Sequence, residues 1–417
     1  MNNRMGVMIA IIFTILHVTT AHKIIERSIE NENTPAARII ANSVNSFSAD
    51  FNGVVFQDKP KENLICSSLS VAMVLMMAAY GADGKTLEVM NKVLHVNNDE
   101  NVQKNSIQSF ISQFNAMKNV QLHLANKIYV KSGLEIKPEF KMITKTTFQS
   151  EIENLNFSNS AVACEEINNW CEKQTNSRIK NLFQPNNFDD DTSLVLVNAV
   201  YFKGNWARKF DVNETKLMSF YHADNTTKNV PMMHSVGKYR YADFPELGAR
   251  IIELPYESTD TSNAVSMIII LPKYINGLQT VEKNLHKVNF THFLMGDQYE
   301  VDLFLPKFKI ESKIDLKVPL STLGMEEIFG NNANFTRITS QPPLKVSKII
   351  QKAFIEVNEE GSEAAAVTGL QISTFSMPIR SEFRIDHPFY YYILKQHVDD
   401  EDDTGIILFQ GRCVDIE

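Results

Sequence analysis

The chain has 417 residues, of which 44% are hydrophobic and 22% are charged, and its formal net charge at pH 7 is -8. A chain of this length buries a large core, which excludes a minimal module held together by disulfides. Its lysines and arginines are dispersed and outnumbered by acidic residues. The composition therefore argues against a nucleic-acid-binding surface.

The N-terminus has the pattern of a secretory signal peptide. Arg4 precedes an apolar stretch that runs from Met5 to Val18, and the small residues Thr19 and Ala21 precede a cleavage site. The stretch is shorter than the roughly 20 residues of a membrane span, which disfavours a membrane anchor. We expect residues 1–21 to be removed, residues 22–38 to form a loose polar arm, and the mature protein to be secreted.

Helical and strand patterns follow in the first half of the chain. Residues 63–66 are typical of a short strand, and residues 69–80 predict a buried helix that ends at Gly81. Residues 120–133 alternate as in a strand, and residues 160–183 predict an amphipathic helix. The apolar residues 194–206 predict a strand buried on both faces.

The second half of the chain is predicted to be rich in strands. They fall at residues 231–244, 250–257, 264–272, 301–311, 386–394 and 405–414, with a short helix at 320–329. No internal repeat, low-complexity linker or composition break divides the chain. This pattern favours one large α+β domain with long sheets.

Five sequons for N-linked glycans agree with a secretory route. They begin at Asn156, Asn213, Asn225, Asn289 and Asn334. An Asn-rich chain also produces sequons by chance, so which of them are occupied is left open.

The 4 cysteines, Cys66, Cys164, Cys171 and Cys413, are too few for a disulfide scaffold. Cys164 and Cys171 lie two turns apart in the predicted helix, about 10 Å, which is too far for a bridge. No C-x-x-C spacing suggests a metal site. We expect mainly free, buried thiols, and we leave open whether Cys66 pairs with Cys413.

No catalytic motif is present. The chain lacks G-x-S-x-G, H-E-x-x-H, a P-loop and G-x-G-x-x-G, and its 10 histidines are scattered. The sequence therefore predicts no enzyme, no metal and no cofactor.

Residues 359–381 form an unusual segment near the C-terminus. After Gly361, which lets the backbone turn, small side chains occupy every second position at Ser362, Ala364, Ala366 and Thr368. If this segment entered a sheet as a strand, these side chains would face the core, where larger ones would overpack it. An Ala-rich helical turn or a solvated loop explains the same residues.

Four stretches resemble the serpin family, and the resemblance covers nearly all of residues 39–417. EEGSEAAAVT at residues 359–368 resembles the hinge of inhibitory members, and VNAVYFKGNW at 197–206 resembles the central-sheet strand. Residues 63–90 and 386–414 resemble the segment beneath that sheet and the C-terminal pair of strands.

The resemblance implies one serpin domain over residues 39–417. Its fold is α+β, with a large central, mostly antiparallel sheet, further sheets, about nine helices and an exposed reactive loop. The implied hinge consists of Glu359, Glu360, Gly361, Ser362, Glu363, Ala364, Ala365 and Ala366. The implied sheet-opening residues are Ser67, Ser70, Asn198, Trp206 and Gln351.

Three positions depart from the family pattern. Cys66 and Ser68 stand where Phe and Pro are usual, and Gln351 replaces a usual His. In the family that His bonds with a Ser and an Asn, which correspond here to Ser67 and Asn198. Gln351 donates and accepts hydrogen bonds but does not titrate. We therefore expect no pH dependence from this site and leave its effect on sheet opening unassigned.

The implied activity is suicide inhibition of a serine protease. The protease cleaves the reactive loop and forms an acyl-enzyme, and the loop then inserts into the central sheet and distorts the protease. Counting from Gly361 places the reactive bond between Phe375 and Ser376, which favours a chymotrypsin-like target. Met377 is an alternative that Pro378 disfavours, and Arg380 is an alternative that suits trypsin-like enzymes.

The remaining expectations concern partners. The segment expected to carry a basic helix, residues 97–121, holds only Lys104 and Lys118, so heparin activation is not expected. We expect a monomer without nucleic-acid or membrane partners. The competing hypothesis is a non-inhibitory serpin with a carrier, storage or chaperone role, and the small hinge residues favour the inhibitor.

Overall fold

The computed structural model describes residues 36–57, 59–96, 99–115, 117, 120–258, 264–287, 291–341, 343–362, 380–396 and 405–416. The predicted signal peptide at 1–21 and the sequon at Asn289 lie outside the described residues.

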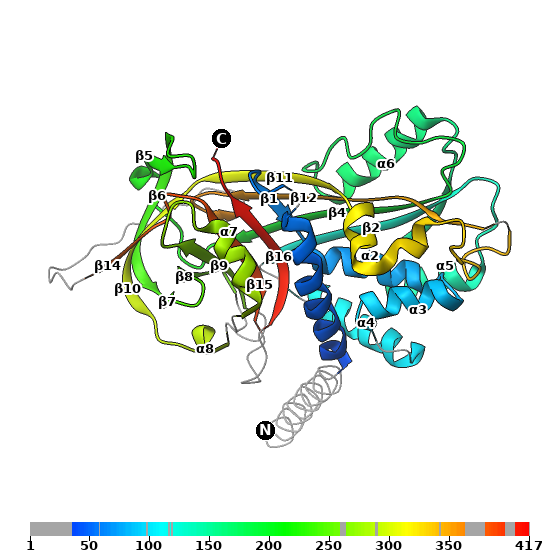
Figure 1. Cartoon of the computed structure of the whole chain (residues 1–417), viewed down its shortest axis with the longest axis horizontal. Coiled ribbons are helices and arrows are strands. Elements are labelled where there is room, and N and C mark those ends of the chain that lie inside the picture. Colours follow the sequence, from blue (N-terminus) through cyan, green and yellow to red (C-terminus); the bar gives the residue numbers. More distant parts are fainter. Residues whose placement is uncertain are drawn as a thin grey trace, which may run out of the picture.

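A long central sheet crosses the molecule in the order β11-β12-β4-β2-β3 (Figure 1). Its strands are β2 Val120–Lys131, β3 Glu151–Leu155, β4 Leu194–Asn205, β11 Phe308–Asp315 and β12 Val346–Val357. A short strand, β13 Gly361–Ser362, also pairs with β4. The β12–β4 and β2–β3 pairs are parallel and the other three are antiparallel, which confirms the predicted, mostly antiparallel sheet.

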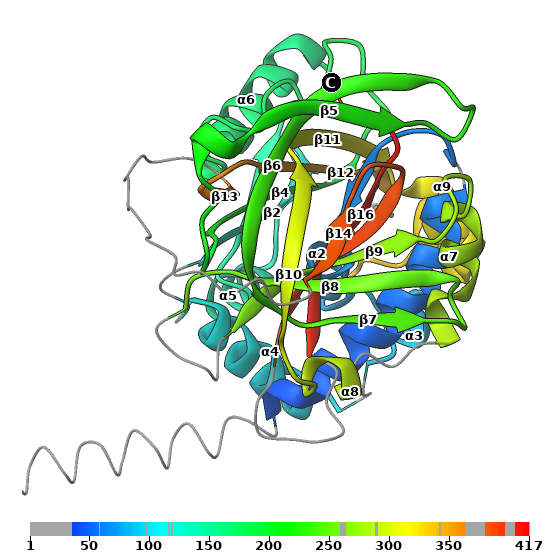
Figure 2. The same cartoon turned by 90° about the vertical axis from the view of Figure 1, so that its left-hand side faces the viewer.

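Two further sheets complete the β structure. The first has the order β1-β16-β15-β9-β8-β7 and the second β14-β10-β6-β5, which stands in front in Figure 2. The first sheet comprises β1 Leu64–Cys66, β7 Tyr241–Phe244, β8 Ala249–Pro255, β9 Val265–Pro272, β15 Phe389–Lys395 and β16 Ile406–Cys413. The second comprises β5 Lys216–Tyr221, β6 Thr227–Tyr239, β10 Tyr299–Pro306 and β14 Ser381–Arg384.

The described part of the chain contains nine α-helical segments, as expected. They are residues 36–57, α2 Ser68–Ala79, α3 Gly84–Val93, α4 Glu100–Asn115, α5 Pro138–Thr147, α6 Ser160–Gln174, α7 Leu278–Asn284, α8 Thr291–Leu294 and α9 Lys317–Leu320. Shorter helical turns are η1 Val212–Glu214, η3 Leu285–Lys287, η4 Ser321–Met325 and η5 Glu326–Phe329. Among the described helices, none combines the length and apolar character needed to cross a bilayer.

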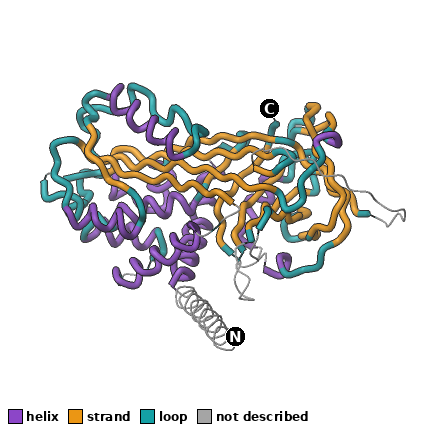
Figure 3. The backbone as a smooth tube through the Cα atoms, turned by 180° about the vertical axis from the view of Figure 1, so that it is seen from behind, coloured by secondary structure: helices purple, strands orange, loops and turns teal. Residues whose placement is uncertain are grey.

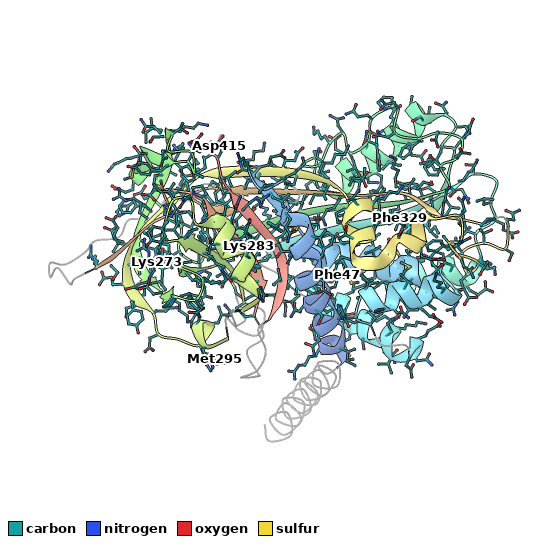
Figure 4. All side chains as sticks on the ribbon, in the orientation of Figure 1. Phe47, Lys273, Lys283, Met295, Phe329 and Asp415 are labelled. Carbon is teal, nitrogen blue, oxygen red and sulfur yellow. The ribbon has the colours of Figure 1, made fainter. Side chains whose placement is uncertain are left out.

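The helices cover both faces of the central sheet. Helices α2 to α5 and residues 36–57 lie on one face, and α6 lies on the other, as Figures 1 and 3 show. Every residue of α2 is buried, and Phe47, labelled in Figure 4, stacks on Phe51 in the same core. A smaller core beneath α6 includes Tyr201 of β4 and Phe354 of β12. The two faces of β4 therefore pack against two different cores.

Four sequence predictions need correction in detail. The single strand predicted at 231–244 is two strands in different sheets, β6 and β7, which end and begin on either side of Arg240. The helix predicted at 160–183 ends at Gln174, because Asn176 and Ser177 take left-handed backbone angles. The single strand predicted at 301–311 is two strands in different sheets, β10 and β11, which end and begin on either side of Lys307. Residues 36–38 of the predicted arm are helical, since Ala37 is already buried in the core.

Candidate functional site

The candidate site lies at the junction between β4 and β12, which we call the seam. These strands pair in parallel from Leu194 and Val346 to Tyr201 and Phe354, and no pairing between them follows. Beyond that point β13 pairs antiparallel with β4, with Ser362 opposite Gly204. Gly204 also pairs with β2 on its other edge. The hinge therefore enters the central sheet on the edge of β4 that faces β12.

Gly361 makes this entry possible. Its φ is +141°, a backbone conformation that L side chains rarely adopt. A Cβ at this position would lie 2.1 Å from the carbonyl oxygen of Gly204. Only glycine fits where the hinge meets β4.

Trp206 fixes the chain just before the hinge. Its backbone N–H donates to the carbonyl of Glu360 at 2.8 Å, and its indole Nε1 donates to the carbonyl of Asn358 at 2.9 Å. The indole is stacked on Tyr256 with ring centroids 4.5 Å apart. The predicted sheet-opening residue Trp206 thus contacts the root of the hinge directly.

Two carboxylates at the root of the hinge, the buried Glu359 and the half-buried Glu360, have lysine partners. Glu359 lies 2.9 Å from Lys307 and accepts a hydrogen bond from Thr215 at 2.8 Å, while Glu360 lies 2.6 Å from Lys209. Burial raises the pKa of Glu359, but the bonds from Lys307 and Thr215 outweigh it and hold the pKa below its ordinary value. Glu359 therefore anchors the hinge as an anion at neutral pH.

Gln351 links the two strands of the seam to the helix beneath them. Its side chain accepts from the backbone N–H of Ser67 at 3.0 Å, and donates to the carbonyl of Ser67 at 2.9 Å and to Oδ1 of Asn198 at 2.6 Å. Both expected partners are present, although Ser67 contributes its backbone. Its hydroxyl instead caps α2 by accepting from the N–H of Ser70.

Asn126 belongs to the same cluster and was missed by the sequence analysis. The amide nitrogen of Asn198 donates to the side-chain oxygens of Ser70 and Asn126. Asn126 lies directly opposite Asn198 in the β2–β4 register, and knowledge of this register would have identified Asn126 as a partner. A polar side chain inside an otherwise apolar strand suggests such a partner, but the sequence does not give the register.

Part of the predicted loop lies outside the described residues. This part holds the hinge residues Glu363, Ala364, Ala365 and Ala366 and the reactive-bond candidates Phe375, Ser376 and Met377. Arg380 is described and exposed, and it forms an ion pair of 3.0 Å with Glu300. Ser381 begins β14 and pairs with Val301 of β10.

The four cysteines are free and buried, as expected. This includes Cys66 and Cys413, whose pairing the sequence left open. Burial raises the pKa of Cys171 to about 12 and also raises the pKa values of the other three thiols. All four are therefore protonated and unreactive at neutral pH.

The described sequons differ in exposure. Asn156, Asn213 and Asn225 are exposed, and Asn334 is half-buried, with Oδ1 accepting hydrogen bonds from Thr336. Among the described residues, no group of three or more His, Cys, Asp or Glu side chains is placed to hold a metal ion.

Comparisons with known proteins identify the family. A family model described as serpin (serine protease inhibitor) matches residues 42–416. The chain belongs to the serpin family. Antichymotrypsin-2 of Bombyx mori is 35% identical to it, over 91% of this chain and 98% of that relative. Antitrypsin of Bombyx mori is 36% identical to it, over 91% of this chain and 94% of that relative. Serpin48 of Tenebrio molitor, described as a highly specific serpin, has a similar structure with a TM-score of 0.80, 32% identity and coverage of 91% of this chain and 99% of that one.

Proposed function

We propose that this protein is a secreted suicide substrate of a chymotrypsin-like serine protease, cleaved after Phe375. Its loop then inserts between β4 and β12 and traps the acyl-enzyme. One observation carries the proposal: at the point where the parallel pairing of β4 and β12 ends, β13 already pairs antiparallel with β4 on the side of β12. The first two residues of an inserted strand are thus in place.

The register of β13 supports the role of the small hinge residues. Each further loop residue would pair with the preceding residue of β4, so Ala364 would face Phe202 and Ala366 would face Val200. Paired residues point to the same face of a sheet. Phe202 and Val200 pack in the main core on the side of α2, so small partners are required there.

The direction of the strands supplies a driving force. A loop that runs antiparallel to β4 also runs antiparallel to β12, because these two strands are parallel. Insertion would therefore replace one parallel junction with two antiparallel ones and pair the backbone groups of the loop. The intact protein is then a kinetically trapped state whose relaxation is triggered by cleavage.

The chemistry of the trap comes from the protease. Its serine attacks the carbonyl carbon of Phe375, the peptide bond to Ser376 breaks, and Ser376 leaves with a free amino group. An ester then links Phe375 to the protease until water hydrolyses it. Insertion of the loop before hydrolysis would move the protease along the sheet and stop the reaction at the ester.

The surroundings of Arg380 support Phe375 as the cleaved residue. Arg380 is paired with Glu300, and Ser381 is paired in β14, so a protease would have to break both contacts to cleave between them. Met377 is followed by Pro378, which disfavours cleavage. The Bombyx relatives are named for chymotrypsin and for trypsin at nearly equal identity, so similarity alone does not choose the target.

The secretory route and the partners remain part of the proposal. The exposed sequons at Asn156, Asn213 and Asn225 suit glycosylation of a secreted chain. Helix α4 carries a single basic residue, Lys104, which supports action without heparin. We propose a monomer that needs no cofactor.

The test is incubation of the mature protein with chymotrypsin and, separately, with trypsin. The proposal predicts a band with the summed mass that survives denaturation with chymotrypsin, and a released peptide that starts at Ser376. Phe375→Ala should lose the chymotrypsin complex, whereas the matched variant Arg380→Ala should keep it. A complex with trypsin alone and a peptide starting at Ser381 would move the site to Arg380, and clean cleavage without a complex would favour a non-inhibitory role.

A further inference from the structure

The segment that follows α6 reaches across both strands of the seam. The guanidinium of Arg178 hydrogen-bonds the hydroxyl of Tyr201 on β4 and lies 3.9 Å from the carboxylate of Glu356 on β12. Ile179, the next residue, is fully buried in the core beneath α6. The segment is therefore fixed over the sheet, and its one arginine contacts both strands.

The position of these contacts along the seam is informative. Tyr201 and Phe354 form the last pair of the β4–β12 register, and their ring centroids lie 6.2 Å apart. Arg178 therefore binds at the place where the two strands stop pairing. This is also the place that the next residues of an inserting loop would reach first.

Insertion is incompatible with both contacts of Arg178. Neighbouring strands lie about 4.8 Å apart, so one inserted strand moves β4 and β12 to about 9.6 Å. One guanidinium that spans the native separation cannot hold Tyr201 and Glu356 after this movement. At least one of the two contacts must break before the loop passes.

We propose that Arg178 is a latch across the seam, a positioning residue that holds β4 and β12 together and sets the rate of loop insertion. The inference rests on the proposed function, because it assigns a rate-controlling contact to the insertion step. Its bond to the buried Tyr201 hydroxyl carries more of the effect than its bond to Glu356. Glu356 is half-exposed and lies 3.9 Å from the guanidinium, so water screens this ion pair.

The chain offers a matched control on the same segment. Lys180 lies two residues from Arg178, but its ammonium group pairs with Glu172 of α6 at 3.1 Å rather than with a strand. Arg178→Ala and Lys180→Ala therefore each remove one cation from an exposed position. Only the first removes a bridge between β4 and β12.

The experiment follows the trapping reaction by rapid mixing with chymotrypsin. The readout is the fluorescence of the two tryptophans, which lie in separate regions: Trp170 on α6 and Trp206 beside the hinge. Arg178→Ala should raise the rate constant from acyl-enzyme to trapped complex by about three- to tenfold, the equivalent of one ordinary net hydrogen bond, and leave acylation unchanged. Arg178→Lys should fall between the wild type and Arg178→Ala, and Lys180→Ala should stay within about twofold of the wild type.

Two results would overturn the latch while leaving the inhibitor intact. One is an unchanged insertion rate in Arg178→Ala, and the other is an equal acceleration in Lys180→Ala. Failure of the proposed function is recognised separately, since the wild type itself would then form no complex and show no fluorescence change after cleavage. Circular dichroism of each variant confirms that it is folded.

Discussion

At the scale of single residues, Gly361 is the position most closely tied to the hinge geometry. We predict that Gly361→Ala lowers the free energy of unfolding by about 1–3 kcal/mol, because its Cβ meets the backbone of Gly204 and its φ is strained. The trapped fraction of protease should fall with it. Chemical denaturation and the chymotrypsin assay measure the two effects.

Gly53 provides the control for this substitution. It lies in the helix over residues 36–57, and a Cβ there has no neighbour within 4 Å. Gly53→Ala should therefore stabilise the protein by up to about 1 kcal/mol. If Gly361→Ala were as stable as Gly53→Ala, the geometric argument for the hinge would be wrong.

Glu359 predicts a pH dependence of stability. Its pKa is lowered in the folded protein from an ordinary value of 4.5, so its contribution is present above that value and is lost as pH falls through the folded pKa. Glu359→Gln should cost about 1–3 kcal/mol at pH 7 and should flatten the decline of Tm in acid. The exposed Glu139→Gln should leave the Tm profile unchanged. Equal profiles for Glu359→Gln and the wild type would contradict this assignment.

The residue scale is also where the sequence had least predictive power. The link between Gln351 and Asn198 was expected only because the chain resembles a known family, and Asn126 was not expected at all. These contacts join β12, β4 and β2 across 72 and 153 residues of sequence. Hydrophobic periodicity identifies a strand but does not tell which residue of another strand lies opposite.

At the scale of elements, the apolar pattern predicted the buried elements well. Helix α2, β4, β15 and β16 lie where the sequence placed them, because each is a long apolar segment bounded by polar or glycine residues. The errors occurred where burial changes within a segment. The chain around Lys307 continues an apolar pattern from β10 into β11, although the two strands belong to different sheets.

The hinge strand gives the prediction at this scale. Ser362→Arg should abolish trapping and convert the protein into a substrate, because a strand inserted in the β13 register would have to hold a charged side chain on the core face of the sheet. Acylation should remain near the wild-type rate, since the reactive bond is untouched. Gel analysis of the reaction with chymotrypsin would show cleaved protein without a complex. A variant that still traps protease would count against insertion at this hinge.

At the scale of the whole molecule, the account depends on a fold that is not at its free-energy minimum. The central sheet has a parallel junction between β4 and β12, and the adjacent chain begins to fill it with β13. The cluster of Gln351, Ser67 and Asn198 and the proposed latch at Arg178 connect the two strands of this junction. The family and fold class followed from the sequence, but the state of the seam required coordinates.

The most direct test of the central claim compares the Tm of the intact protein with that of protein nicked once between residues 370 and 377. The nick should be made by a protease that is not trapped, so that only the loop differs. The account predicts that nicking raises Tm well above that of the intact protein, because the freed loop pairs with β4 and β12. An unchanged or lower Tm would contradict it, since a cut in a loop that cannot insert only adds chain freedom.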